Sequence, residues 1–188
     1  MTANLPPTGQ LNTAEFVIRP ARPEDTAGIR RVAREAWAAT YAGIIYPEVQ
    51  DNFITHAYSE ASLALSINGD GQDFWLRVAE TTGDSPEIIG YTEVYRRPSI
   101  APDVEMTRIY LLPSWQKKGV GKFLFEKVLA EIRALRPGLR PPRLWLSVAA
   151  ENKQAIRFFE QRGFRFEKDF EGDLPGQKVA LQEYVLEI

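Results

Sequence analysis

A short glycine-containing segment in the second half of the chain has the composition of an anion-binding loop. Residues 116–121 read Gln-Lys-Lys-Gly-Val-Gly, after an apolar run over 109–112 and before a helical pattern. Glycine lets the main chain come close to an anion, and the free N–H groups at the start of a helix supply donors and partial positive charge. The segment therefore predicts a site for the diphosphate of a nucleotide-type cofactor.

Two other phosphate-binding glycine motifs fit this segment less well. A Walker loop ends in Gly-Lys-Ser or Gly-Lys-Thr, whereas Gly121 and Lys122 are followed by Phe123. A dinucleotide-binding fingerprint needs a third glycine, at the position of Leu124, and a parallel βαβ unit. Neither motif therefore describes this segment well.

The elements that must position this loop follow an α+β pattern. Apolar residues at helical spacing predict a helix that begins near residue 23 and further helices over about 47–56, 60–67, 119–135 and 152–162. The helix over 119–135 ends at Arg136-Pro137-Gly138. Runs of β-branched and aromatic residues predict strands over 15–19, 74–79, 87–95, 104–112, 144–148, 164–170 and 177–187. We expect a flexible tail over residues 1–13 and one domain over 14–188.

The overall composition narrows the classes of function. The chain has 188 residues, a net charge of -2 and no cysteine. The near-zero charge gives no general attraction to nucleic acid or to an anionic membrane. Without cysteine there are no disulfides, thiolate metal sites or cysteine nucleophiles, and His56 is the only histidine, so we predict no metal site. The start of the chain lacks a leader pattern, and we expect a cytoplasmic protein.

Two motifs together resemble those of one enzyme family. Residues 116–121 fit Gln/Arg-x-x-Gly-x-Gly/Ala, and Thr107 to Pro113 match the strand and turn that precede it. Residues 152–164 are similar to Asn-x-x-Ala-x-x-x-Tyr-x-x-x-Gly-Phe. Over about 15–188 the chain thus resembles the GCN5-related N-acetyltransferases (GNAT), with a lean toward the polyamine-acetylating PaiA-like members. The resemblance implies a mixed, mostly antiparallel sheet of about seven strands flanked by helices.

The resemblance also implies how acetyl-coenzyme A is bound, without a metal ion. In the family, the main-chain amides of 117–122 hold the diphosphate, and the strand at 109–111 separates from its neighbour and pairs with the pantetheine amides. An unpaired donor on that strand would act as an oxyanion site. The cofactor-binding residues so implied are Ile109, Tyr110, Leu111, Gln116, Lys117, Lys118, Gly119, Val120, Gly121, Lys122, Asn152, Phe158 and Phe159.

Acetylation of an amine needs a group that removes a proton, because an ammonium ion has no lone pair for attack. Glu105 is the first candidate, since it stands fourteen residues before Gly119, where some histone-acetylating relatives carry their base. Glu93, on the preceding strand, is the second candidate, and it could instead recognise a cationic substrate. Ser147 occupies the place where ribosomal-protein acetylating members have a base on the fifth strand, so that mechanism is absent.

The chain departs from the family at Phe159, where most members have a tyrosine that protonates the departing thiolate. Phenylalanine cannot donate a proton, although a thiolate with a pKa of about 8.5 can leave without an acid. Tyrosine hydroxyls elsewhere could substitute, and the sequence does not rank them: Tyr41, Tyr46, Tyr110 and Tyr184.

We therefore predict an acetyl-coenzyme A dependent N-acetyltransferase that passes the acetyl group directly to a small amine or polyamine. Acidic residues such as Glu93, Glu105 and Asp103 favour a cationic acceptor. One alternative is acetylation of a protein N-terminus or lysine, and another is an acyl-coenzyme A sensor with little activity. The last strand could pair between subunits of a homodimer.

Overall fold

One seven-stranded sheet forms the centre of the protein. The computed structural model describes residues 15–71, 73–97, 102–134 and 142–188, so the predicted tail over 1–13 and the predicted helix end at 136–138 lie outside the described residues. The strand order is β1-β2-β3-β4-β5-β7-β6, and the strands are β1 (Phe16–Pro20), β2 (Phe74–Thr81), β3 (Ile88–Arg96), β4 (Val104–Leu111), β5 (Arg143–Ala149), β6 (Arg165–Leu174) and β7 (Gln177–Glu187).

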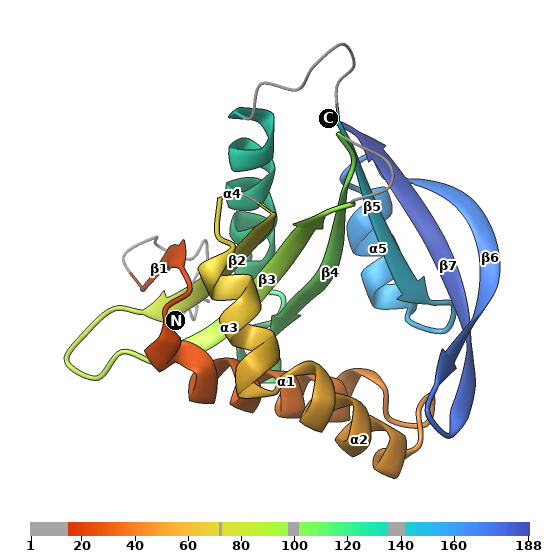
Figure 1. Cartoon of the computed structure of the whole chain (residues 1–188), viewed down its shortest axis with the longest axis horizontal. Coiled ribbons are helices and arrows are strands. Elements are labelled where there is room, and N and C mark those ends of the chain that lie inside the picture. The colour runs from red at the N-terminus through yellow and green to blue at the C-terminus, as the bar shows by residue number, and fades with distance from the viewer. Residues whose placement is uncertain (1–14, 72, 98–101, 135–141) are drawn as a thin grey trace, which may run out of the picture.

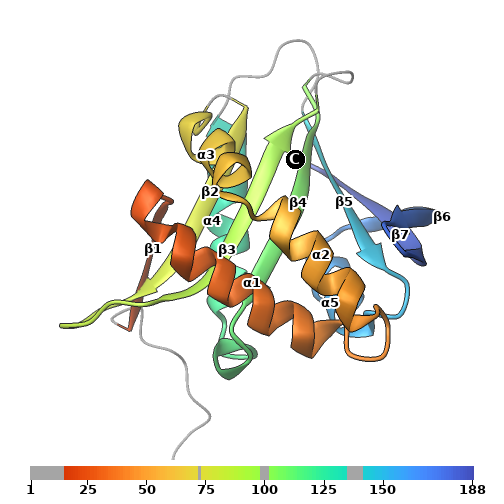
Figure 2. The same ribbon diagram turned by 60° about the horizontal axis from the view of Figure 1, so that its bottom comes forward.

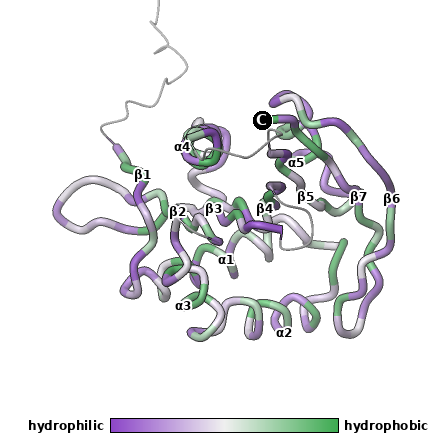
Figure 3. The backbone as a smooth tube through the Cα atoms, turned by 45° about the horizontal axis from the view of Figure 1, so that its top comes forward, coloured by the Kyte–Doolittle hydropathy of each residue, from purple (hydrophilic) through white to green (hydrophobic). Residues whose placement is uncertain are grey.

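Helices cover both faces of this sheet. The helices are α1 (Thr26–Thr40), α2 (Pro47–Ala57), α3 (Glu60–Asn68), α4 (Val120–Ala134) and α5 (Lys153–Glu160). Helices α1, α2 and α3 lie on one side of the sheet (Figure 2), and α4 lies against the other side of β2 to β4 (Figure 3). The α+β architecture expected from the sequence, a mostly antiparallel sheet between helices, is confirmed.

Helix α4 shows how the sequence fixes the position of the glycine loop. Val120, Leu124, Val128 and Ile132 recur every fourth residue, and each is 0% exposed. This spacing places the four side chains on one face of a helix, which packs on the sheet. The packed helix holds its own N-terminus, and the loop that precedes it, at the end of β4.

The sheet is interrupted between β4 and β5, its one parallel pair. The two strands are paired only where Val104–Met106 face Leu144–Leu146, and every other neighbouring pair is antiparallel. Thr107 is an extra residue in β4, because Glu93 pairs with Arg108 and Val94 with Met106. Such a bulge bends a strand. Beyond it the two strands separate, and β5, β7 and β6 turn away from β4 (Figure 1).

The free edge of this part of the sheet is β6 and not the last strand. Strand β7 lies between β5 and β6, with its hydrogen-bonding groups used on both sides. The expectation that the last strand could pair between subunits is therefore wrong for β7. The hairpin tip between β6 and β7 instead contacts the loop after α1, where Gln177 accepts from the Tyr46 N–H at 2.8 Å and donates to the Ile44 carbonyl at 2.8 Å.

Candidate active site

The glycine loop presents main-chain donors that the protein does not use. Lys117 and Gly119 have positive φ angles of 59° and 88°, which turn the chain sharply before α4. The first bonds of the helix run from the Lys122 and Phe123 N–H groups to the Gly119 carbonyl, at 2.9 and 3.2 Å. Among the described residues, the N–H groups of 117–121 have no acceptor. These five groups form a concave set of donors at a helix N-terminus, which suits an anion.

The main-chain N–H of Lys122 does not belong to the free donors, contrary to the prediction for 117–122. Its N–H closes the first turn of α4, so it is not free in the way that the preceding five are. Its side chain is 58% exposed and lies 3.7 Å from Glu126. Lys118 also points elsewhere, with its ammonium nitrogen 4.8 Å from the centre of the Trp115 ring.

A cavity of about 770 Å³ runs from this loop to the gap between β4 and β5. Its volume lies within the roughly 300–1,000 Å³ that is usual for ligand sites. It contacts both sequence motifs, which also meet directly where Gln154 donates to Gln116 at 3.4 Å. Of the predicted cofactor-binding residues, all but Lys118 and Val120 line it: Ile109, Tyr110, Leu111, Gln116, Lys117, Gly119, Gly121, Lys122, Asn152, Phe158 and Phe159.

Strand β4 offers main-chain groups to this cavity. The Leu112 N–H donates to the Ile89 carbonyl at 2.9 Å, toward β3. Successive residues of a strand direct their N–H groups to opposite sides, so the N–H groups of Ile109 and Leu111 point away from β3. The register with β5 ends at Met106, which leaves these two groups without a partner strand. An extended chain with amide groups can therefore pair with β4 in the gap.

Asn152 can serve two roles. Its side-chain oxygen accepts from the Ala155 N–H at 3.1 Å and caps the start of α5. Its amide nitrogen has no partner among the described residues, and the residue lines the cavity. The same side chain therefore caps the helix N-terminus and keeps a donor for a ligand.

Basic side chains on and just after α5 were missed by the sequence argument. Lys153 and Arg157 of α5, and Arg162 beyond its end, all line the cavity. Arg162 lies 3.5 Å from the centre of the Phe158 ring and donates to the Phe158 carbonyl at 2.6 Å. The spacing of Lys153 and Arg157, four residues apart on one helix, could have indicated a basic face.

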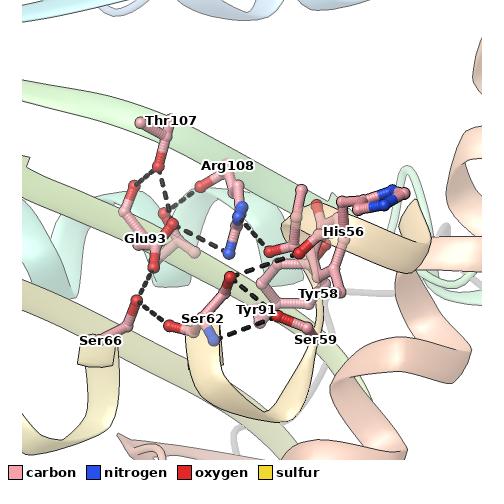
Figure 4. A network of polar contacts seen from close by, with 11 residues as sticks. His56, Tyr58, Ser59, Ser62, Ser66, Tyr91, Glu93, Thr107 and Arg108 are labelled. Atoms are coloured by element: carbon pink, nitrogen blue, oxygen red, sulfur yellow. Dashed lines mark hydrogen bonds and ion pairs between the residues drawn. The ribbon is translucent and has the colours of Figure 1, made fainter. Parts of the chain in front are cut away.

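Glu93 does not line the cavity, and its carboxylate is fully occupied (Figure 4). One oxygen accepts from the Ser66 hydroxyl, and the other accepts from Thr107 at 2.9 Å and lies 3.1 Å from Arg108. Arg108 in turn donates to the Ala57 carbonyl at 2.8 Å and stands 4.2 Å above the Tyr58 ring. Glu93 is 5% exposed. A carboxylate with three donors and little exposure is part of the framework, so the structure does not support Glu93 as a base.

Glu105 lies beside the cavity and does not line it, although its neighbour Met106 does. One carboxylate oxygen accepts from the Tyr95 hydroxyl at 3.0 Å and lies 3.3 Å from Arg97. The other oxygen has no partner among the described residues, and the side chain is 20% exposed. Glu105 therefore keeps one oxygen able to accept a hydrogen bond, at a position outside the cavity lining.

Asp103 is not available to an acceptor. It is 0% exposed and accepts from the Trp145 indole at 2.8 Å and from Arg143 at 3.1 Å. These contacts join β4 to β5 just before the two strands separate. The expectation that Asp103 attracts a cationic substrate is therefore wrong.

The tyrosines that could replace the missing one at position 159 are separated by the structure. Phe159 is 6% exposed and packs edge-to-face on Phe158 and Phe164. Tyr46 is 58% exposed, and Tyr184, outside the cavity lining, donates to Gln182 at 3.2 Å. The two that line the cavity are Tyr41 and Tyr110, whose hydroxyl oxygens lie 3.1 Å apart.

The described residues contain no group of three or more His, Cys, Asp or Glu side chains arranged to hold a metal ion. No helix in the same part of the chain has the length and apolar character needed to cross a bilayer.

Comparison with known proteins places this fold and site in one family. The model of the acetyltransferase (GNAT) family matches residues 31–164. The chain is 31% identical over 150 residues to a spermidine N(1)-acetyltransferase of Thermoplasma acidophilum, which covers 80% of this chain and 88% of the relative. An uncharacterized N-acetyltransferase of Mycobacterium tuberculosis is 34% identical over 144 residues, 75% of this chain and 83% of the relative.

Solved structures agree with this assignment. The PaiA N-acetyltransferase of Thermoplasma acidophilum, crystallised in complex with coenzyme A, is 28% identical with a TM-score of 0.72 over 92% of this chain and 99% of the other. A GCN5-related N-acetyltransferase of Rhodopseudomonas palustris shares the fold at 20% identity, with a TM-score of 0.70 over 96% of this chain and 100% of the other. The chain belongs to the acetyltransferase (GNAT) family.

Proposed function

We propose that the protein transfers the acetyl group of acetyl-coenzyme A directly to a primary amine. The observation that carries this proposal is the row of five unpaired N–H groups over 117–121, of which those of Lys117, Gly119 and Gly121 belong to residues that line the cavity reaching the gap beside β4. These groups suit the diphosphate of coenzyme A, and the basic side chains of α5 add positive charge around it. The chain has no cysteine to hold an acetyl group, which favours direct transfer.

The unpaired groups of β4 have a matching role in this reaction. The Ile109 and Leu111 N–H groups suit the carbonyl oxygens of an extended pantetheine arm. A donor fixed by a strand is already in place when negative charge develops on the thioester oxygen, so it stabilises that charge without reorganisation. The side chain of Asn152 adds a further donor where α5 begins.

Glu105 is the base that we propose for the amine. It keeps one carboxylate oxygen free among the described residues, whereas both oxygens of Glu93 are occupied. A water between Glu105 and the cavity would carry the proton, because Glu105 itself is outside the lining.

The acceptor that we propose is a small polyamine. Support comes from the relative named spermidine N(1)-acetyltransferase and from two neighbouring carboxylates, Glu105 and Glu183, whose side chains are 20% and 14% exposed. Arg97 lies 3.3 and 3.6 Å from them and Lys168 lies 3.4 Å from Glu183, so part of their charge is balanced by cations of the protein. Acetylation of a protein N-terminus or lysine is the alternative acceptor class.

A panel of acceptors tests this proposal. Purified protein with acetyl-coenzyme A is assayed for thiol release with spermidine, spermine, putrescine and a lysine-containing peptide, and coenzyme A binding is measured by calorimetry. We expect binding, and release that depends on a polyamine. Release with the peptide alone would assign the protein-acetylating alternative. Binding without release for any amine would favour an acyl-coenzyme A sensor, for which Phe159 is the specific support, and absence of binding would contradict both.

A further inference from the structure

No tyrosine of α5 lines the cavity. Two tyrosines from other elements do, Tyr41 and Tyr110. Tyr41 follows the last residue of α1, and Tyr110 lies on β4 next to Ile109, whose N–H points into the gap. The two segments are far apart in the sequence, and their hydroxyl oxygens are 3.1 Å apart. The pair therefore forms only when α1 is packed on the sheet.

Aromatic packing fixes this pair in place. The ring of Trp37 lies 4.7 Å from that of Tyr41 and 6.2 Å from that of Tyr110, and the ring of Tyr91 lies 6.0 Å from that of Tyr110. Rings at these separations hold one another by edge and face contacts. The hydroxyls have little freedom to seek other partners, so their contact is a built feature of the site.

Counting protons shows that one hydroxyl hydrogen of the pair is unused. Two hydroxyls carry two hydrogens, and the bond between them uses one. Neither oxygen has another partner among the described residues. By contrast, the hydroxyl of Tyr95 donates to Glu105 and that of Tyr184 donates to Gln182. The spare hydrogen of the pair lies on a residue that lines the cavity.

We propose that the Tyr41 and Tyr110 hydroxyls form a proton relay that protonates the departing thiolate in place of a tyrosine at position 159. This inference rests on the proposed function. The lone pair of the amine forms the new N–C bond, and the electron pair of the C–S bond leaves with sulfur. One hydroxyl gives its proton to sulfur and takes the proton of the other hydroxyl. The ammonium group of the acceptor first loses one proton to Glu105 through water. The second proton, which the nitrogen loses once the N–C bond has formed, is carried by water to the second hydroxyl, so protons and electrons balance.

The environment of the pair explains why two hydroxyls are needed. Burial raises the pKa of Tyr110 well above its ordinary value, and burial also raises the pKa of Tyr41 despite the hydrogen bond between the two hydroxyls. A phenolate is therefore disfavoured here, and a single isolated hydroxyl would be a poor acid. A hydroxyl that receives a proton as it gives one never becomes a phenolate, and the contact at 3.1 Å permits this.

The test removes the two hydroxyls singly and together, and then adds a tyrosine hydroxyl at position 159. Variants Tyr41→Phe, Tyr110→Phe and the double variant are assayed for kcat, KM and coenzyme A affinity, with Tyr46→Phe as the exposed control. General acid catalysis contributes about 10²–10⁴-fold, so we expect kcat to fall by about 100-fold with coenzyme A affinity within about threefold. Adding Phe159→Tyr to the double variant should recover at least about tenfold of the lost kcat.

Two results would overturn the inference. One is a double variant that binds coenzyme A as wild type does and keeps kcat within about twofold. The other is a double variant that loses kcat but does not recover with Phe159→Tyr, which would assign the pair a structural role. Thermal unfolding of each variant shows whether it is folded. Lack of thiol release in wild-type protein would refute the proposed function itself, whereas release that survives in the double variant refutes only the relay.

Discussion

The cofactor side of the cavity and the acidic residues expected to face the acceptor use their polar groups in opposite ways. On the cofactor side, the N–H groups of 117–121 and of Ile109 and Leu111 have no partner among the described residues. Glu93 and Asp103, which the sequence suggested for the acceptor, lie outside the cavity lining and are buried with donors from their own protein. Binding capacity therefore lies in main-chain groups, while these two acidic side chains serve the framework.

Replacing Glu93 should give the largest effect, a loss of free energy of unfolding. Glu93→Gln removes the charge that faces Arg108 in a buried network, and loss of one partner of such a pair costs about 3 kcal/mol, roughly 150-fold in the unfolding equilibrium. Denaturant unfolding measures this change. Glu105→Gln serves as the matched control, with an expected cost below about 1 kcal/mol. Equal stability of the two variants would contradict the framework role assigned to Glu93 and not to Glu105.

Replacing Glu105 should instead lower kcat. Glu105→Gln removes the proposed acceptor of the amine proton, and we expect kcat to fall by about 100-fold while the protein stays folded and binds coenzyme A. The loss should diminish at high pH, where more of the polyamine is already neutral. A pH profile of kcat measures both features. A variant with the wild-type kcat at neutral pH would remove Glu105 from the mechanism.

Removing a single main-chain donor should have a smaller effect, on affinity alone. Gly121→Pro deletes one of the five N–H groups, at the second position of α4, within the first turn where proline is tolerated. Gly121→Ala adds a methyl group at the same place, 3.4 Å from Leu111 and 3.6 Å from Phe158, but keeps the N–H, so it is the matched control. A charge-assisted hydrogen bond contributes about 1.5–3 kcal/mol, so we expect coenzyme A to bind about 10- to 100-fold more weakly to the proline variant than to the alanine variant.

Calorimetry of the two variants decides this point. Thermal unfolding shows whether both remain folded. Equal affinity would mean that the N–H of residue 121 makes no contact with the ligand, and the cofactor side would lose one of its main-chain donors.

The contrast between main-chain donors and buried acidic side chains also explains what the sequence could predict. The glycine loop and α4 are local: their residues are neighbours in the chain, and the spacing of Val120, Leu124 and Val128 already predicts the buried face. The cap at Asn152 is local too. These features needed no knowledge of distant partners, which is why the predicted elements agree with the fold.

Side-chain roles depended on distant partners and were harder to predict. Glu93 meets Ser66, 27 positions away in the chain, and Asp103 meets Trp145, 42 positions away. Strand alternation gives the face on which a carboxylate lies but not which donors fill it. The contact between Tyr41 and Tyr110 likewise joins residues 69 positions apart, so only the three-dimensional structure could rank the tyrosines.

The central claim is that the free N–H groups of 117–121 hold the diphosphate of coenzyme A, and a crystal structure of the protein with coenzyme A tests it most directly. The account predicts that most of these five nitrogens lie within about 3.2 Å of diphosphate oxygens, with the pantetheine arm extended along Ile109 and Leu111. A diphosphate bound elsewhere, or a loop whose N–H groups remain without ligand contacts while coenzyme A is fully bound, would contradict it.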